Sequence, residues 1–208
     1  MGTLGMEQTT VSVEYTLEEM DSRLTTHTRE RALQLEILTL VGDDAWSRRD
    51  DVGEIYRQGF DSSHEQAEQF IELSFAHILE YEGAILLLAN VDGQPAGMLY
   101  GYTYKPNQWW SKHVASSIIN AGYMHYLDDA FSLAELAVLP EFQGKGVGSA
   151  LLRQLLDNQP QRYTLLSTSA DPEKGATKLY ERFGFKVIVS LFRYSQTSAA
   201  VHIMAAGN

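Results

Sequence analysis

The sequence contains no cysteine, and this absence excludes disulfide bonds, thiolate metal sites and a cysteine nucleophile. It also has no apolar run that approaches the ~20 residues of a membrane-spanning helix. The first residues carry neither the basic start nor the apolar core of a signal peptide. The sequence therefore predicts a cytoplasmic protein that does not associate with membranes.

Positive charge is scarce, because 16 Lys and Arg stand against 27 Asp and Glu, for a formal net charge of −11. Such a surface repels nucleic acid, and no basic stripe offsets the repulsion. The excess of acid favours a cationic substrate, although it also serves simple solubility. The six histidines show no metal-ligand spacing, so we expect no metal. We expect a monomer or a homodimer.

The length of 208 residues suits one domain with a sizeable core and an appended element. We expect an N-terminal helical extension over residues 1–32 and a single domain over residues 33–208. Hydrophobic patterning predicts strands at 33–41, 84–91, 95–104, 131–139, 162–167, 185–192 and 199–204, and helices at 51–60, 64–81, 114–119, 147–156 and 173–183. The sequence Asp92-Gly93 between two strands indicates a hairpin. This order of elements predicts a mixed α/β sheet.

The most informative stretch is Leu133–Leu152, which reads LAELAVLPEFQGKGVGSALL. An apolar strand leads through a proline and alternating glycines into an amphipathic helix. The first N–H groups of a helix lack intrahelical partners, and the helix dipole is positive at that end. Glycine allows an anion to approach the main chain closely. The stretch therefore predicts a loop that cradles a phosphate group.

Three phosphate-loop patterns compete for this stretch. A Walker A loop needs Gly-Lys-Ser/Thr, which does not occur, and the dinucleotide pattern GxGxxG fails at Ser149. The third pattern, Gln/Arg-x-x-Gly-x-Gly/Ala, is matched by Gln143, Gly146 and Gly148. It resembles motif A of the GNAT superfamily, the acyl-CoA-dependent N-acyltransferases. The alternative is an ordinary glycine-rich turn between a strand and a helix.

A second segment, Lys178–Phe185, agrees with this resemblance. Its sequence KLYERFGF resembles motif B of the same superfamily, a helix ending in Leu-Tyr followed by a turn and Gly-Phe. Gly184 stands where a helix C-terminus favours a residue with positive φ. One residue departs from the family pattern: Glu173 occupies the position where an asparagine often contacts the pantetheine arm, and a carboxylate cannot donate as an amide does.

The resemblance implies the GNAT fold, a mixed sheet of about six or seven strands, mostly antiparallel, with a splayed parallel pair at its centre and flanking helices. It implies acetyl-CoA as co-substrate. The segment expected to bind the pantetheine arm and the pyrophosphate comprises Leu136, Ala137, Val138, Gln143, Gly144, Lys145, Gly146, Val147, Gly148 and Ser149.

Two residues are candidates for the chemistry. Glu135 is the one charge in an apolar strand, and in this family an acidic residue there often acts as the general base that deprotonates the amine. The alternative is a structural ion pair. Tyr180, the tyrosine of motif B, is expected to protonate the departing thiolate, and its alternative role is packing against Phe183 and Phe185.

Aromatic residues before the cradle are candidates for the acceptor site. Tyr100, Tyr102 and Tyr104 lie on one face of a strand, and with Trp109 and Trp110 they suit a pocket for an organic cation, or else core packing. We therefore predict direct acetyl transfer from acetyl-CoA to a primary amine, with a small molecule favoured over a peptide. The alternatives are a non-catalytic acyl-CoA-binding module of the same fold and a protein or peptide N-acetyltransferase.

Overall fold

The computed structural model describes residues 10–11, 34–173 and 176–208. The predicted helical extension over residues 1–32 falls outside these residues, except for the two residues of strand β1 (Thr10–Val11). The boundary between the extension and the domain therefore stays a prediction.

The core is an eight-stranded sheet with the order β1-β2-β3-β4-β5-β6-β8-β7. Its other strands are β2 (Leu35–Leu40), β3 (Ile85–Val91), β4 (Gln94–Thr103), β5 (Ala130–Val138), β6 (Tyr163–Ser169), β7 (Lys186–Phe192) and β8 (Val201–Gly207). Every neighbouring pair is antiparallel except β5 and β6, which are parallel. The predicted mixed sheet with a central parallel pair is confirmed.

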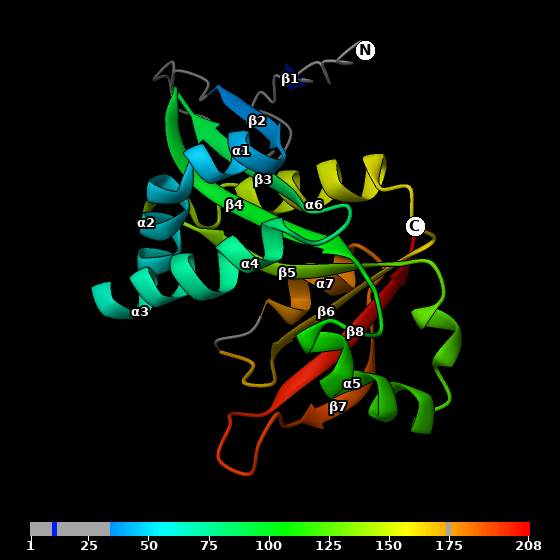
Figure 1. Cartoon of the computed structure of the whole chain (residues 1–208). Helices are drawn as coiled ribbons and strands as arrows, with labels where there is room; N and C mark the ends of the chain where they lie inside the picture. The colour runs from blue at the N-terminus through cyan, green and yellow to red at the C-terminus, as the bar shows by residue number, and fades with distance from the viewer. Residues whose placement is uncertain (1–9, 12–33, 174–175) are drawn as a thin grey trace, which may run out of the picture.

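The helices cover both faces of the sheet (Figure 1). They are α1 (Gly42–Ser47), α2 (Arg49–Gly59), α3 (His64–Gln69), α4 (Ala76–Leu79), α5 (Trp109–Asn120), α6 (Val147–Asn158) and α7 (Thr177–Arg182). A π-helical segment, η2 (Phe70–Phe75), joins α3 to α4, and short 3₁₀ helices form at η3 (Met124–Leu127) and η4 (Pro140–Phe142). None of the helices in the described part of the chain combines the length and apolar character needed to cross a membrane.

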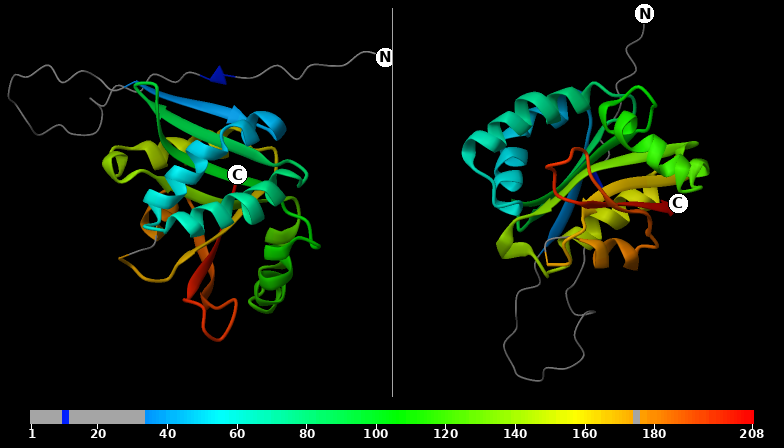
Figure 2. Two further views of the ribbon diagram at one scale, coloured as in Figure 1. Left: turned by 60° about the vertical axis from the view of Figure 1, so that its left-hand side comes forward. Right: turned by 90° about the horizontal axis from the view of Figure 1, so that it is seen from below.

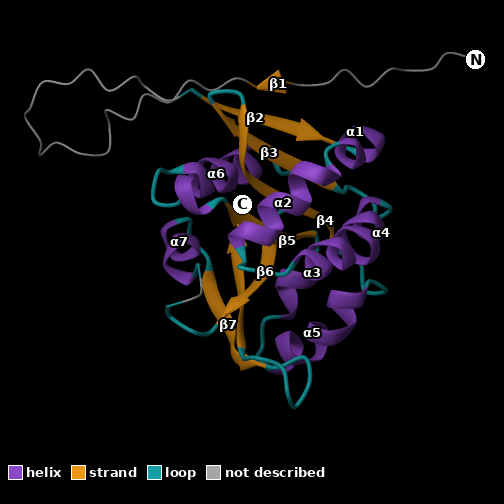
Figure 3. Ribbon diagram, turned by 90° about the vertical axis from the view of Figure 1, so that its left-hand side faces the viewer, coloured by secondary structure: helices purple, strands orange, loops and turns teal. Residues whose placement is uncertain are grey.

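Helices α1 to α5 lie on one side of the sheet, and α6 and α7 lie on the other (Figures 2 and 3). On the α6 side, Leu151 and Leu155 pack with Leu99 in one core cluster. On the opposite side two clusters form, one beneath α1 to α4 and one beneath α5. Alternation of side chains along each strand divides the residues between these faces.

Four helices differ from the sequence prediction. Helix α1 forms over Gly42–Ser47, where the sequence predicts no helix. The expected helix over 64–81 contains the π-helical turn η2, whose i→i+5 pitch brings Phe70 and Phe75 onto one face, where both rings pack on Tyr100. Helix α7 begins at Thr177 rather than Glu173, because the Ser169 and Asp171 side chains accept bonds from nearby backbone N–H groups and hold a turn there. Helix α5 begins at Trp109, five residues earlier than expected, because the Gln108 side chain binds the Lys105 N–H and the Thr103 carbonyl and sets the entry to the helix.

Candidate active site

A β-bulge in β5 sets the direction of its central side chains. Tyr100 pairs with Glu135 and Gly101 pairs with Leu133, so Ala134 is the extra residue. Leu133 and Leu136 both contact the core on the α6 side. Ala134 and Glu135, which lie between them, therefore face the side of α1 to α5. Gly101 is required opposite the bulge, because a Cβ there would overlap the Ser132 carbonyl oxygen and the Phe131 ring.

The parallel strands β5 and β6 separate immediately before the bulge. They pair only from Ala130 with Tyr163 to Ser132 with Leu165. Beyond these pairs, the edge of β5 that faces β6 at Leu136, Ala137 and Val138 pairs with no strand in the described part of the chain. A cavity of about 1000 Å³ opens in the gap. Its walls come from β5, β6, the glycine loop, α7 and the end of α2, and its lining includes Glu135, Ser167, Tyr180 and Arg182.

The glycine loop between η4 and α6 forms one end of this cavity. Gly144 and Gly146 adopt positive φ values of 73° and 85°, and Gly146 is the N-cap of α6. Within the described residues, no hydrogen bond uses the N–H groups of Gly144, Gly146, Val147, Gly148 and Ser149, whereas the Ala150 N–H already bonds to Gly146. These free donors and the positive end of the α6 dipole suit an anion.

Gln143 and Lys145 contribute differently from the glycines. The Gln143 side-chain amide donates to the Val138 carbonyl oxygen at 3.0 Å, and its backbone N–H donates to Pro140. Gln143 therefore fastens the loop to the end of β5. The Lys145 side chain is exposed, and its ammonium lies 5.7 Å from the centre of the Phe142 ring. It does not line the cavity, so it would meet a bound anion from outside.

Glu135 lines the same cavity as the first residues of α6, and it forms no ion pair within the described residues. The alternative of a structural ion pair is therefore absent from this part of the chain. Burial raises the pKa of Glu135 to about 7. A carboxyl with this pKa is half ionised at neutral pH, which suits a general base.

Tyr180 enters the cavity from α7. Its residue is 5% exposed, and its ring lies 5.6 Å from that of Phe185. The Gly184 N–H bonds to Glu181 and the Phe185 N–H bonds to Tyr180, a Schellman arrangement that ends α7 at a glycine with φ of 83°. Burial, and then the charge of Glu135, raises the pKa of the Tyr180 phenol. The hydroxyl therefore keeps its proton at neutral pH.

The aromatic residues predicted for the acceptor site lie elsewhere, and none of them lines this cavity. Tyr104 packs in the core beneath α5, and the Tyr102 ring packs against Tyr81 at 4.9 Å. Trp109 is 60% exposed, and Trp110 donates to Tyr194. The acceptor role of all four stays a prediction.

Three other tyrosines interact with the charge of Glu135. The pKa of each of Tyr56, Tyr100 and Tyr194 is raised chiefly by burial, and the charge of Glu135 contributes to all three. These tyrosines belong to α2, β4 and the β7–β8 loop, and none of them lines the cavity. Tyr100 precedes Tyr102 by two residues on the same face of β4. The register shift at the bulge pairs Tyr100, and not Tyr102, with Glu135 on β5.

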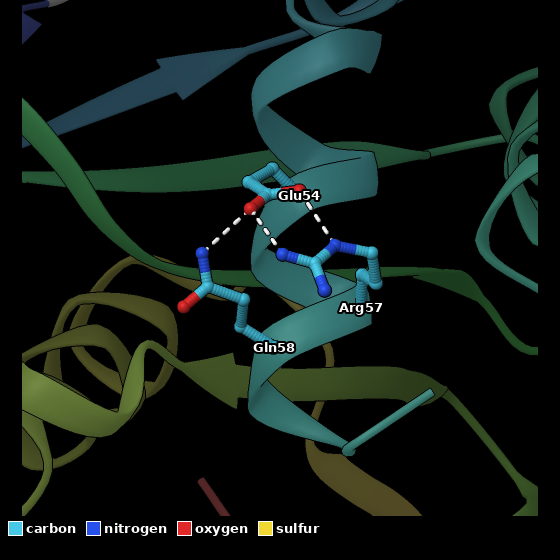
Figure 4. A network of polar contacts seen from close by, with 3 residues as sticks. All are labelled: Glu54, Arg57 and Gln58. Atoms are coloured by element: carbon cyan, nitrogen blue, oxygen red, sulfur yellow. Dashed lines mark hydrogen bonds and ion pairs between the residues drawn. The ribbon is translucent and has the colours of Figure 1, made fainter. Parts of the chain in front are cut away.

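The C-terminal end of α2 also reaches the cavity, through Gly59, Phe60 and Asp61. One turn earlier, the Arg57 guanidinium donates to both carboxylate oxygens of Glu54 at 2.9 and 2.6 Å, and Gln58 donates at 2.6 Å (Figure 4). The hydrogen bonds from Arg57 and Gln58 lower the pKa of Glu54 to about 2. This network braces the last turn of the helix beside the cavity.

Sequence reasoning missed several polar residues that line the cavity, among them Ser167 on β6 and Arg182 on α7. Arg182 follows the motif B tyrosine by two residues, and this closeness in sequence is the feature that could have indicated its place beside the cavity. Glu173 does line the cavity, as its place in motif B suggests. No group of side chains suited to a metal ion occurs within the residues that the structure describes.

The comparisons with known proteins agree with this geometry. A family model described as an acetyltransferase (GNAT) domain matches residues 82–187, just over half of the chain. The chain belongs to the GNAT superfamily. This GNAT domain is 33% identical over 115 residues to the GCN5-like protein acetyltransferase Rv2170 of Mycobacterium tuberculosis, across 52% of this chain and 56% of that protein. The chain thus matches little more than half the length of this relative.

Solved structures show the same fold at low identity. The PaiA N-acetyltransferase of Thermoplasma acidophilum, in complex with coenzyme A, has a TM-score of 0.55 at 16% identity, covering 84% of this chain and 99% of that one. The ribosomal-protein-S18-alanine N-acetyltransferase of Escherichia coli has a TM-score of 0.55 at 18% identity, covering 84% and 94%. The solved structures confirm the predicted fold, and the family model confirms the predicted family, which is described as an acetyltransferase (GNAT) domain.

Proposed function

We propose that this GNAT domain transfers the acetyl group of acetyl-CoA directly to a primary amine, with Glu135 as general base and Tyr180 as hydrogen-bond donor to the leaving thiolate. The observation that carries the proposal is the single cavity that joins both residues to the glycine loop. Within the described residues, the unused N–H groups of Gly144 and of Gly146 to Ser149 suit the pyrophosphate, and the edge of β5 at Leu136–Val138, which pairs with no described strand on that side, suits the pantetheine arm.

The transfer begins with proton removal. An alkyl ammonium with a pKa of ~10 must lose a proton before its nitrogen can attack, and the Glu135 carboxylate accepts that proton. The amine nitrogen then bonds to the thioester carbonyl carbon. The tetrahedral intermediate collapses, the C–S bond breaks, and the sulfur leaves as a thiolate that takes a hydrogen bond or a proton from Tyr180.

The two residues are coupled electrostatically. The negative charge of Glu135 contributes to the raised pKa of Tyr180. Once Glu135 has accepted the proton of the amine, this charge is gone, and the Tyr180 hydroxyl becomes a better donor as the thiolate forms. The order of events thus matches the need for acid at the second step.

A small amine is the acceptor that the surroundings of Glu135 favour. The Glu135 carboxylate lines the cavity, and its negative charge attracts an alkyl ammonium. A second candidate acceptor is a lysine or N-terminus of a protein, because the relative from Mycobacterium tuberculosis is named a protein acetyltransferase.

A thiol-release assay with acetyl-CoA and a panel of amines and peptides tests the proposal. We expect turnover with at least one small amine, and log(kcat/KM) should rise with pH and level off near pH 7 as Glu135 ionises. In Glu135→Gln the loss should be greatest near neutral pH and smaller at high pH, where free amine is abundant. Preference for peptides would favour the second candidate, and tight acetyl-CoA binding without any acceptor would favour a sensing module.

A further inference from the structure

A chain of hydrogen bonds connects helix α5 to the cavity. The Trp110 indole N–H donates to the Tyr194 hydroxyl at 2.9 Å, and the Tyr194 hydroxyl lies 2.8 Å from the hydroxyl of Ser167. Trp110 stands on α5, Tyr194 in the β7–β8 loop and Ser167 on β6, so residues far apart in sequence meet at one point. Ser167 also lines the cavity.

Chemistry sets the direction of this chain. An indole N–H can only donate, so the Tyr194 oxygen accepts the hydrogen bond from Trp110. The phenol is a stronger acid than the alcohol, and the described residues offer its hydrogen no partner other than Ser167. Tyr194 therefore donates to Ser167. The hydrogen of Ser167 is left free, and it has no other acceptor within the described part of the chain.

The position of Ser167 places it at the reacting end of the cavity. The last pair between the parallel strands is Ser132 with Leu165. Ser167 lies two residues further along β6 on the same face, so it stands across the gap from the bulge at Ala134 and Glu135. The pKa of Tyr194 is raised mainly by burial but also by the charge of Glu135, which agrees with this placement.

We propose that Ser167 donates a hydrogen bond to the carbonyl oxygen of the bound thioester, and that Tyr194 and Trp110 are positioning residues that orient its hydroxyl. The contact rests on the proposed binding of acetyl-CoA. No bond is made or broken by Ser167: its hydrogen bond polarises the carbonyl and strengthens as negative charge develops on the oxygen during attack. Helix α5 is thereby linked to the reacting group.

Calorimetric titration of acetyl-CoA and of CoA separates this contact from the rest of the ligand, because only acetyl-CoA carries the thioester carbonyl. In Ser167→Ala we expect acetyl-CoA affinity to fall about three- to tenfold, the range of one neutral hydrogen bond, while CoA affinity changes less than twofold. Tyr194→Phe keeps the ring that stacks 5.6 Å from Trp109. Its affinity for acetyl-CoA should fall about twofold, while its affinity for CoA should not change. In the double variant, Tyr194→Phe should add nothing, because its effect acts through Ser167.

Tyr126→Phe is the matched control, because its ring packs 5.1 Å from Tyr163 and its hydroxyl takes part in no hydrogen bond within the described residues. It should bind both ligands as the wild type does. Three results would overturn the Ser167 contact alone. They are equal losses of affinity for CoA and acetyl-CoA, no loss of acetyl-CoA affinity in folded Ser167→Ala, and additive losses in the double variant. A wild-type protein that binds neither ligand would overturn the proposed function together with it.

Discussion

Replacing Glu135 by glutamine should stabilise the protein in a manner that depends on pH. The carboxyl has a pKa of about 7 in the folded protein because burial disfavours its charged form. In the unfolded chain the pKa returns to the ordinary glutamate value of 4.5. Between these values the folded state binds more protons than the unfolded state, so the free energy of unfolding falls as pH rises. Glutamine keeps the shape of the side chain and removes this penalty.

The magnitude follows from the two pKa values. A shift of one pKa unit corresponds to about 1.4 kcal/mol, so the full penalty approaches about 3 kcal/mol above pH 7. At pH 5 only about 1 kcal/mol of it has developed, because the unfolded carboxyl is then partly ionised. Glu135 is only partly buried, and solvent in the cavity reduces both values. The advantage of Glu135→Gln over the wild type should thus grow by about 2 kcal/mol from pH 5 to pH 8.

Urea unfolding of both proteins at several pH values measures this difference directly. Glu68→Gln removes the same charge from the exposed surface of α3 and is the control, because it should leave the pH dependence of the wild type in place. A stability difference between Glu135→Gln and the wild type that stays constant from pH 5 to pH 8 would refute a raised pKa, and with it a base poised near neutrality.

Two further variants test the other parts of the site. Tyr180→Phe keeps the ring beside Phe185 and removes the donor, so kcat should fall at least about tenfold while acetyl-CoA affinity stays within about twofold; a wild-type rate under rate-limiting chemistry would exclude the acid role. Gly101→Ala should lower the free energy of unfolding by about 2 kcal/mol or more, because its Cβ overlaps the Ser132 carbonyl oxygen; chemical denaturation that shows no loss would mean that the bulge does not depend on this glycine.

The sequence predicts those parts of the site in which backbone geometry demands a particular residue type. Gly144, Gly146 and Gly184 all have positive φ, and each stands in a recognisable motif. Glu135 is visible as the lone charge in an apolar strand, since burial of a charge needs a reason. These features are local, so a single sequence reveals them.

The bulge and the contacts across the sheet are not local. One extra residue at Ala134 changes which face the next side chains occupy, and alternation alone cannot locate it. Tyr102 and Tyr104 therefore looked as suitable as Tyr100 for a place near the acceptor. Ser167 and Tyr194 meet across 27 positions of sequence, a distance over which periodicity carries no information.

The central claim is that the glycine loop binds the pyrophosphate of acetyl-CoA, and calorimetric titration of acetyl-CoA into Gly146→Asp tests it most directly. The new carboxylate would stand at the N-terminus of α6, where the bound anion must lie. Gly122→Asp is the matched control, since Gly122 also has φ of 85° but lies outside the cavity. We predict that Gly146→Asp loses well over tenfold in affinity while Gly122→Asp binds as the wild type does. Unchanged affinity in folded Gly146→Asp would contradict the account.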